Sequence, residues 1–107
     1  MNDSLPSWLS KRPPCYADTE DGDYVQDPGH VEILGMLADL NATTNTFFVI
    51  YPDDEDIDWS ISVHTRPGAL GGYEIEHRDA ATGEHTTTTE ADHTTITSHL
   101  LDWISHR

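Results

Sequence analysis

Length, composition and charge set the first limits on this chain. Its 107 residues are enough for one small domain with a single core, and a hydrophobic fraction of 36% favours folding over disorder. Twenty acidic and five basic residues give a formal net charge of −15, with a pI near 4.4. A field of this sign repels nucleic-acid phosphates and anionic lipids and attracts a basic partner. We therefore expect no direct binding to nucleic acid or membrane.

Three features indicate a cytoplasmic protein. Cys15 is the single cysteine, so no intramolecular disulfide can form. The amino-terminal sequence lacks the basic stretch and apolar run of a secretory signal. The longest apolar run, residues 47–51, is far too short to span a bilayer.

Residues 1–26 predict a Pro-rich acidic arm that is partly ordered. They show little hydrophobic periodicity, and acidic residues crowd their second half. Several apolar side chains could pack onto a domain, the later ones as a short leading strand: Trp8, Leu9, Tyr16, Tyr24 and Val25. We assign a single α+β domain to residues 27–107.

A helix is predicted to follow this arm, from Asp27 to Asn41. Asp27 suits the N-cap, and Pro28 suits the first turn because its missing N–H has no partner there. Asn41 is a reasonable stop. Apolar residues recur at helical spacing between these ends, namely Val31, Ile33, Leu34, Met36, Leu37 and Leu40.

Four strands are predicted next. Residues 46–51 form a continuous apolar run, which is typical of a strand covered on both faces. Residues 57–65 and 72–78 alternate in polarity, and residues 84–90 are Thr-rich and suit an edge strand. In residues 57–65 the apolar members of the alternation are Ile57, Trp59, Ile61 and Val63.

A second helix closes the chain. Thr89 and Asp92 resemble a capping box with Asp in place of the usual Glu. The apolar face of this helix would carry Ile96, Leu100, Trp103 and Ile104. The predicted fold is therefore α+β, with an antiparallel four-stranded meander sheet packed with two helices in two layers, plus the partly ordered arm.

Seven histidines raise the question of a metal site. Their spacing matches no zinc signature, and the chain has no second cysteine. His64 and His77 fall on neighbouring predicted strands, with His85 on the next one, so convergence of these three imidazoles is one hypothesis. Polar-face histidines are the simpler interpretation, and we expect no metal and no cofactor.

Catalytic motifs are missing from the sequence. It has no G-x-S-x-G elbow, and Cys15 has no obvious base beside it. Gly68, Gly71 and Gly72 fall between strands, not at a strand-to-helix turn that could cradle a phosphate. With 20 acids in the chain, any pair of carboxylates carries no information. We therefore expect a binding protein and not an enzyme.

Acidic clusters are the candidate partner-binding residues. The densest is in Tyr51–Asp58, with the sequence YPDDEDID, between two predicted strands. Like charge at this density destabilises the fold by self-repulsion unless a partner or salt offsets it. A solvated surface is the simpler alternative. The predicted partner-binding residues are Asp21, Asp23, Asp53, Asp54, Glu55, Asp56, Asp58, Glu74 and Glu76.

Three segments of the chain form a familiar pattern: the run VEILGMLADLNATTNTFFVIYPDDEDIDWSISV, then LGGYEIEH, and a closing helix with LLDWI. Together they resemble the first-described Imm-type immunity proteins of actinobacterial polymorphic toxin systems. The resemblance covers about residues 25–105 and does not extend to the arm or the Thr-rich strand. It implies a cytoplasmic antitoxin, a monomer in a 1:1 complex, that occludes the catalytic cleft of a toxin domain. The implied partners are nucleic-acid deaminases and nucleases, which need basic clefts. An acidic inhibitor would gain association rate from electrostatic steering.

Two alternatives stay open. An acidic DNA-mimic inhibitor of a defence nuclease, of the anti-restriction or anti-CRISPR type, would arrange its acids in rows spaced like duplex phosphates. A domain adapted to a salty cytoplasm would spread its acids evenly, bind no such partner and unfold at low salt.

Overall fold

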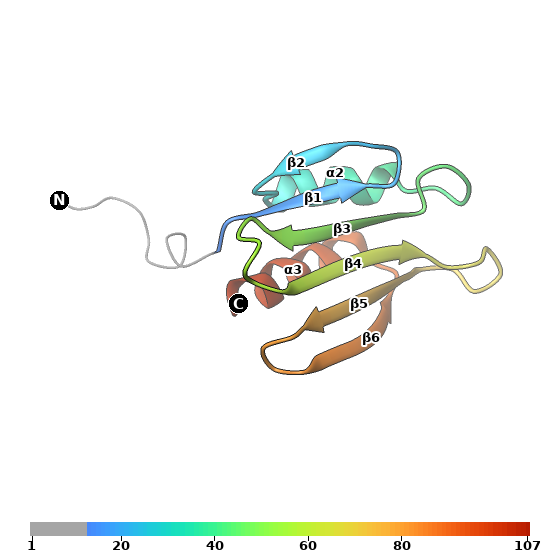
Figure 1. Ribbon diagram of the computed structural model, residues 1–107. Helices are drawn as coiled ribbons and strands as arrows, with labels where there is room; N and C mark the ends of the chain where they lie inside the picture. Colours follow the sequence, from blue (N-terminus) through green and yellow to red (C-terminus); the bar gives the residue numbers. More distant parts are fainter. Residues whose placement is uncertain (1–12) are drawn as a thin grey trace.

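The computed structural model describes residues 13–107 (Figure 1). Within these residues, two helices and six strands follow one another along the chain, which confirms the α+β class. Their bounds are β1 (Cys15–Thr19), β2 (Tyr24–Gln26), α2 (His30–Asp39), β3 (Phe47–Pro52), β4 (Trp59–Thr65), β5 (Tyr73–Asp79), β6 (Glu84–Glu90) and α3 (His93–Ser105).

All of these strands join one antiparallel sheet in the order β2-β1-β3-β4-β5-β6. Strands β3 to β6 form the predicted meander. The expected total of four strands is wrong, because β1 and β2 extend the sheet beyond β3. β1 pairs with β3 from Cys15 opposite Pro52 to Thr19 opposite Phe48. Residues 15–26, which we assigned to the arm, are therefore part of the sheet.

Residues 15–26 gave a weak sequence signal because their alternation is short and rests on small side chains. Cys15 and Ala17 are fully buried, whereas Tyr16 between them points to the other face of the sheet. This five-residue strand pairs with both β2 and β3, so its place in the sheet depends on residues outside the strand itself. The predicted packing of Trp8 and Leu9 lies outside the described residues.

Helix α2 begins two residues later than predicted, at His30, with Gly29 as its N-cap. Asp27 does not cap this helix because it connects the end of β2 to β1. It has a positive φ of 48°, and its carboxylate accepts a hydrogen bond from the Cys15 amide at 3.1 Å. The Glu32 carboxylate instead accepts a hydrogen bond from the Gly29 amide, at 2.8 Å, and closes the first turn.

Helix α3 begins at His93, because Thr89 still belongs to β6. Its N-cap is Asp92, whose carboxylate accepts from the amide and hydroxyl of Thr95, both at 2.8 Å. These bonds lower the pKa of Asp92 because they favour the charged carboxylate. Helix α2 ends at Asp39, slightly earlier than predicted.

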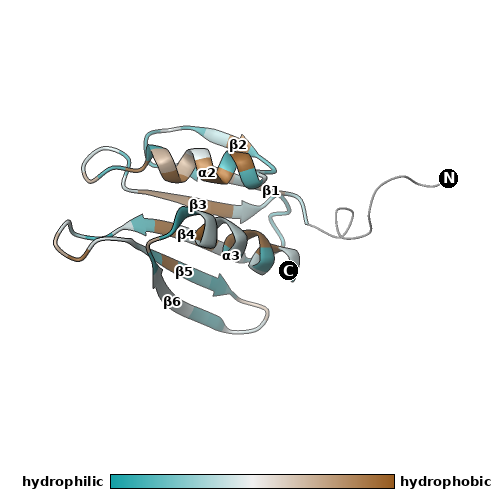
Figure 2. Ribbon diagram, turned by 180° about the vertical axis from the view of Figure 1, so that it is seen from behind, coloured by the Kyte–Doolittle hydropathy of each residue, from teal (hydrophilic) through white to brown (hydrophobic). Residues whose placement is uncertain are grey.

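The hydrophobic core lies between one face of the sheet and both helices. Figure 2 shows α2 and α3 together in front of the sheet, so the second layer covers a single face. The helical faces predicted from sequence are confirmed except at two positions: Val31 is 75% exposed, and Leu34 is half-buried outside the core cluster. Ile57, which is 47% exposed, also lies outside the core. The buried core residues are Cys15, Ala17, Ile33, Met36, Leu37, Phe48, Ile50, Trp59, Ile61, Val63, Ile75, Ile96, Leu100, Trp103 and Ile104.

Candidate interaction surface

Opposite the helices, the sheet has a face that neither α2 nor α3 covers; we call it the open face (Figure 1). Across β3, β4 and β5 it carries Val49, Ser62 and Glu76 in register. The expectation that residues 46–51 are covered on both faces is therefore wrong for the part of the chain described. The open-face residues of β3 are half-buried, shielded by their neighbours on the same face: Phe47, Val49 and Tyr51.

Three tyrosines form a row over β2, β1 and β3 on the open face, and we call Tyr24, Tyr16 and Tyr51 the tyrosine ladder. The ring centroids of Tyr16 and Tyr24 are 5.4 Å apart and the rings stack; those of Tyr16 and Tyr51 are 5.5 Å apart. Tyr24 is 60% exposed. Burial, with the nearby Asp18 carboxylate, raises the pKa of Tyr16 above its ordinary value of 10.0. The Tyr16 ring is therefore neutral near pH 7.

The tyrosine ladder adjoins the acidic hairpin, which we define as residues 53–58 between β3 and β4. The Tyr24 hydroxyl donates a hydrogen bond to Gln26 Oε1. Gln26 Nε2 in turn donates to both carboxylate oxygens of Asp53, at 3.1 and 2.8 Å. The Asp53 amide donates to the Pro14 carbonyl at 3.1 Å. Side-chain and backbone hydrogen bonds thus hold the acidic hairpin against β1 and β2.

The acidic hairpin has no cationic partner among residues 13–107. Its acids are all exposed, and Asp54 Oδ1 accepts a hydrogen bond from the Asp56 amide at 2.9 Å, which shapes the turn. The ion pairs in the described part of the chain are His85–Glu76, His106–Asp102, Arg107–Asp79 and Arg107–Glu84. No described basic side chain forms an ion pair with the hairpin carboxylates; Arg78 lines the same surface pocket as Asp58, at the β4 end of the hairpin.

Asp21 and Asp23 lie at the opposite end of the sheet from the acidic hairpin. Because β1 runs antiparallel to β3, the turn after Thr19 sits beside the start of β3, about 17 Å along that strand from the hairpin. Asp21 Oδ1 accepts from the Thr19 hydroxyl. Neighbouring Glu20 accepts from the hydroxyl and amide of Thr46, both at 2.7 Å, which lowers the pKa of Glu20. The carboxylates of Glu20 and Asp21 thus have partners within the fold.

Glu74 and Glu76 lie on the open face, on β5. Glu76 forms an ion pair with His85 of β6, at 2.7 Å, and exposed Glu74 lies between His64 of β4 and Thr89 of β6. The structure therefore places these glutamates on the same face as the tyrosine ladder, but two strands away. The predicted partner-binding residues do not form one continuous cluster.

The hypothesis that His64, His77 and His85 converge on a metal is wrong. His64 and His85 lie on the open face, where His64 Nε2 is 3.0 Å from Ser62 Oγ. His77 is 3% exposed on the core face, because neighbouring residues of β5 alternate between faces. Among residues 13–107, no group of three or more His, Cys, Asp or Glu side chains could hold a metal ion.

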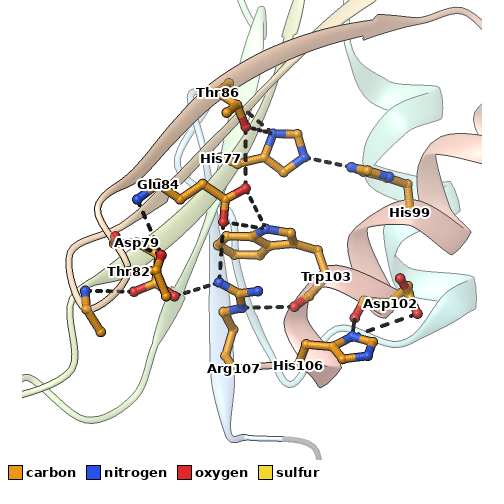
Figure 3. A network of polar contacts seen from close by, with 11 residues as sticks. His77, Asp79, Thr82, Glu84, Thr86, His99, Asp102, Trp103, His106 and Arg107 are labelled. Carbon is orange, nitrogen blue, oxygen red and sulfur yellow. Dashed lines mark hydrogen bonds and ion pairs between the residues drawn. The ribbon is translucent and has the colours of Figure 1, made fainter.

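His77 instead meets His99 of α3, with their Nε2 atoms 2.6 Å apart (Figure 3). The carbonyl oxygen of Thr86 lies 3.3 Å from His77 Nδ1, and a carbonyl can only accept a hydrogen bond. Donation from His77 Nδ1 to this carbonyl leaves His77 Nε2 as the acceptor and His99 Nε2 as the donor; the Thr86 hydroxyl also lies 3.3 Å from His77 Nδ1. Burial lowers the pKa of His77, and the neighbouring His99 lowers it further.

A second polar cluster joins the β5–β6 hairpin to the end of α3 (Figure 3). Arg107 Nη1 lies 2.6 Å from Asp79 Oδ2 and 3.6 Å from Glu84 Oε1, with the arginine side chain 13% exposed. Its guanidinium carbon is 3.9 Å from the Trp103 ring centroid. Trp103 Nε1 also donates to Glu84 Oε1 at 3.3 Å. Every partner in this cluster is internal, which is the pattern of a structural contact.

Sequence reasoning missed the tyrosine ladder and the His77–His99 pair. The tyrosines come from three strands, and two of those, β1 and β3, are neighbours in the sheet although β2 and α2 lie between them in the sequence. The one local signal was the Cys-Tyr-Ala pattern at residues 15–17, in which an aromatic side chain alternates with small apolar ones.

In the part of the chain that the structure describes, no helix combines the length and apolar character needed to cross a membrane. Comparisons with protein-family models, with curated proteins and with solved structures found no match to this chain.

Proposed function

We propose that this protein is a non-enzymatic inhibitor of the immunity-protein type. It binds the basic substrate cleft of a cognate toxin domain that acts on nucleic acid, a deaminase or nuclease, in a 1:1 complex in the cytoplasm. The observation that supports this most is the acidic hairpin beside the tyrosine ladder. Exposed carboxylates without a described ion-pair partner adjoin aromatic rings on the sheet, and aromatic anchors with complementary charge are typical of protein-binding surfaces.

Two physical effects would make such a surface an inhibitor. The net charge of −15 steers a basic domain toward the chain and speeds association. A hairpin held at both strands changes shape little on binding, so less ordering entropy opposes the complex. Once docked, the acidic hairpin occupies the volume and the charges that the phosphates of the substrate need.

The salt-adapted alternative has one observation in its favour, which is that acids are spread over the whole domain. They occur at both ends of the sheet, and Asp39 and Asp102 are exposed on the helix layer. The experiment must therefore separate charge at the acidic hairpin from charge elsewhere. Matched pairs of substitutions achieve this.

The test begins with the tagged full chain expressed with its neighbouring genes. Toxin-like proteins that remain bound through a salt wash are identified, and each is expressed with and without this chain. We expect the chain to restore growth of cells that produce the bound toxin. If no neighbouring gene product is toxic, or if growth is not restored, the immunity proposal is overturned.

Glu55→Gln with Asp56→Asn forms the informative variant, because these side chains accept no hydrogen bond from a described residue. The control is Asp39→Asn with Asp102→Asn, which changes the net charge from −15 to −13 in the same way. We expect the hairpin variant to need more protein for protection than the control. Equal protection by both would remove the acidic hairpin from the proposed contact.

A further inference from the structure

Resting on the proposed function, we propose that the tyrosine ladder is an arginine-binding anchor for the basic partner. Arginine side chains of that partner would lie against the rings of Tyr24 and Tyr16, with their guanidinium groups toward Asp18 and Asp53. In this proposal the tyrosine ladder makes the central contact with the partner, and the acidic hairpin speeds association by electrostatic steering.

The rings are available to a partner in a way that core aromatics are not. Tyr24 is 60% exposed, and the rings of Tyr24 and Tyr16 are stacked at 5.4 Å. Gln26 accepts from the Tyr24 hydroxyl and donates to Asp53, so this ring is oriented before any partner arrives. A pre-positioned, half-exposed aromatic pair loses little conformational freedom on binding.

Charge complementarity identifies the occupant. Asp18 and Asp53 are among the groups that raise the pKa of Tyr16, so their negative charge acts directly at the ladder. In residues 13–107, the cation that lies over an aromatic ring is Arg107 over Trp103, on the other side of the sheet. The ladder therefore combines aromatic faces and nearby carboxylates without a described cation to fill them. A second copy of this chain, also at −15, would be repelled.

Arginine fits this arrangement better than lysine does. Its planar guanidinium can stack on a tyrosine ring while its N–H groups reach a carboxylate. Lysine offers a compact, strongly hydrated charge that cannot stack in the same way. The proposal therefore predicts a preference for arginine at equal charge, which general electrostatic attraction to an acidic protein does not.

The test is an NMR titration of the full chain with two capped peptides, Gly-Arg-Gly-Arg-Gly and Gly-Lys-Gly-Lys-Gly. We expect the arginine peptide to bind several-fold more tightly and to shift the amide signals of Tyr16, Tyr24 and Gln26 most. Tyr24→Thr should weaken arginine-peptide binding about two- to fivefold and remove the arginine preference. Tyr24→Phe keeps the ring and should retain that preference.

Leu70→Thr is the matched control, since Leu70 is 62% exposed on the loop between β4 and β5, far from β2 in the sheet order. Equal binding of the two peptides, or equal binding by Tyr24→Thr and the wild type, would overturn the anchor. Amide signals of the tyrosine ladder that shift as the protein concentration is raised would show that a second copy of the chain binds the open face. Ladder signals that shift in the double variant Lys11→Gln with Arg12→Gln would instead assign the open face to the chain's own first residues. Either result also overturns the proposal.

Failure of this inference and failure of the proposed function give different results. The peptide titration requires no toxin, so it tests the ladder whether or not an immunity partner exists. Growth protection that survives in Tyr24→Thr, together with loss of the arginine preference, would reject the anchor and leave the function standing. An arginine preference in a chain that protects against no toxin would support the anchor and reject the immunity role.

Discussion

The Nε2 atoms of His77 and His99 lie 2.6 Å apart at the contact between β5 and α3. One imidazole must donate and the other accept, and the Thr86 carbonyl makes His77 the acceptor. Protonation of His77 makes its Nε2 a donor, and the contact is then kept only with His99 in the tautomer that accepts at Nε2. Burial opposes the charge that protonation adds to His77, so the neutral imidazole is the favoured form at this contact between α3 and the sheet.

This contact predicts a pH dependence of stability. The folded-state pKa of His77 lies below its unfolded value of 6.5, so below that pH the unfolded chain binds a proton that the folded chain does not. Stability from this site is complete above pH 6.5 and falls as the pH drops toward the folded pKa. We expect the free energy of unfolding, measured in urea, to decline less between pH 7.5 and 5.5 in His77→Gln than in the wild type.

The comparison between proteins is essential, because acidification also protonates carboxylates and relieves the repulsion of a chain at −15. That effect is common to both proteins and cancels in the difference. Replacement of exposed His30 by Gln is the control and should leave the pH dependence unchanged. An identical pH dependence in His77→Gln and the wild type would rule out the titration of this pair.

Arg107 is predicted to stabilise the β5–β6 hairpin against α3. Its ion pair with Asp79 is nearly buried, with the side chains 13% and 10% exposed, so Arg107→Gln leaves an unpaired carboxylate inside the protein. We expect a loss of about 3 kcal/mol in the free energy of unfolding. Urea unfolding monitored by tryptophan fluorescence measures this loss, because Trp103 contacts Arg107 directly.

Arg78→Gln is the control for this prediction, since Arg78 is exposed on the open face and forms no ion pair within residues 13–107. The double variant Asp79→Asn with Arg107→Gln should recover part of the lost stability, because it removes the unpaired charge. A loss no larger than that of Arg78→Gln would contradict the structural role of the ion pair.

The acidic hairpin is predicted to act on the rate of association with the bound partner. Replacing Asp53, Asp54 and Asp56 by Asn and Glu55 by Gln keeps one acceptor oxygen in each side chain and removes four charges; Gln26 then has a single oxygen to donate to at position 53. We expect association to slow several-fold at low salt and to approach the wild-type rate at high salt, where screening removes the steering. Stopped-flow or surface-plasmon measurements at two salt concentrations check this, with thermal unfolding as the test that the fold is intact.

Salt should affect stability only modestly. The sheet and helices bury a continuous apolar core, so we expect the chain to remain folded at 10 mM salt, with Tm rising by a few degrees as screening reduces self-repulsion. Circular dichroism across a salt series gives the answer. Unfolding at low salt would instead favour a domain adapted to a salty cytoplasm.

Local patterns in the sequence determined the parts of the fold that need only neighbours along the chain. The apolar spacing of Ile33, Met36 and Leu37 predicted one helical face, and the Ile96–Ile104 pattern predicted the other. Strands β3 to β6 form a meander, so each pairs with the next strand in sequence. Local patterns predicted all four: an apolar run for β3, alternating polarity for β4 and β5, and Thr-rich residues for β6. The acidic hairpin was also readable, because its acids are consecutive.

Tertiary structure alone decided which distant segments share a surface. β1 pairs with β3 across an intervening helix, and this pairing converts residues 15–26 into strands and aligns Tyr16 with Tyr51. It also separates Asp21 from the acidic hairpin and places His77 on the opposite face from His64. Composition and hydrophobic periodicity describe only the side chains that follow one another along a single strand. The face that several strands build together depends on sheet order and register, and those follow from hydrogen bonds between residues far apart in the sequence.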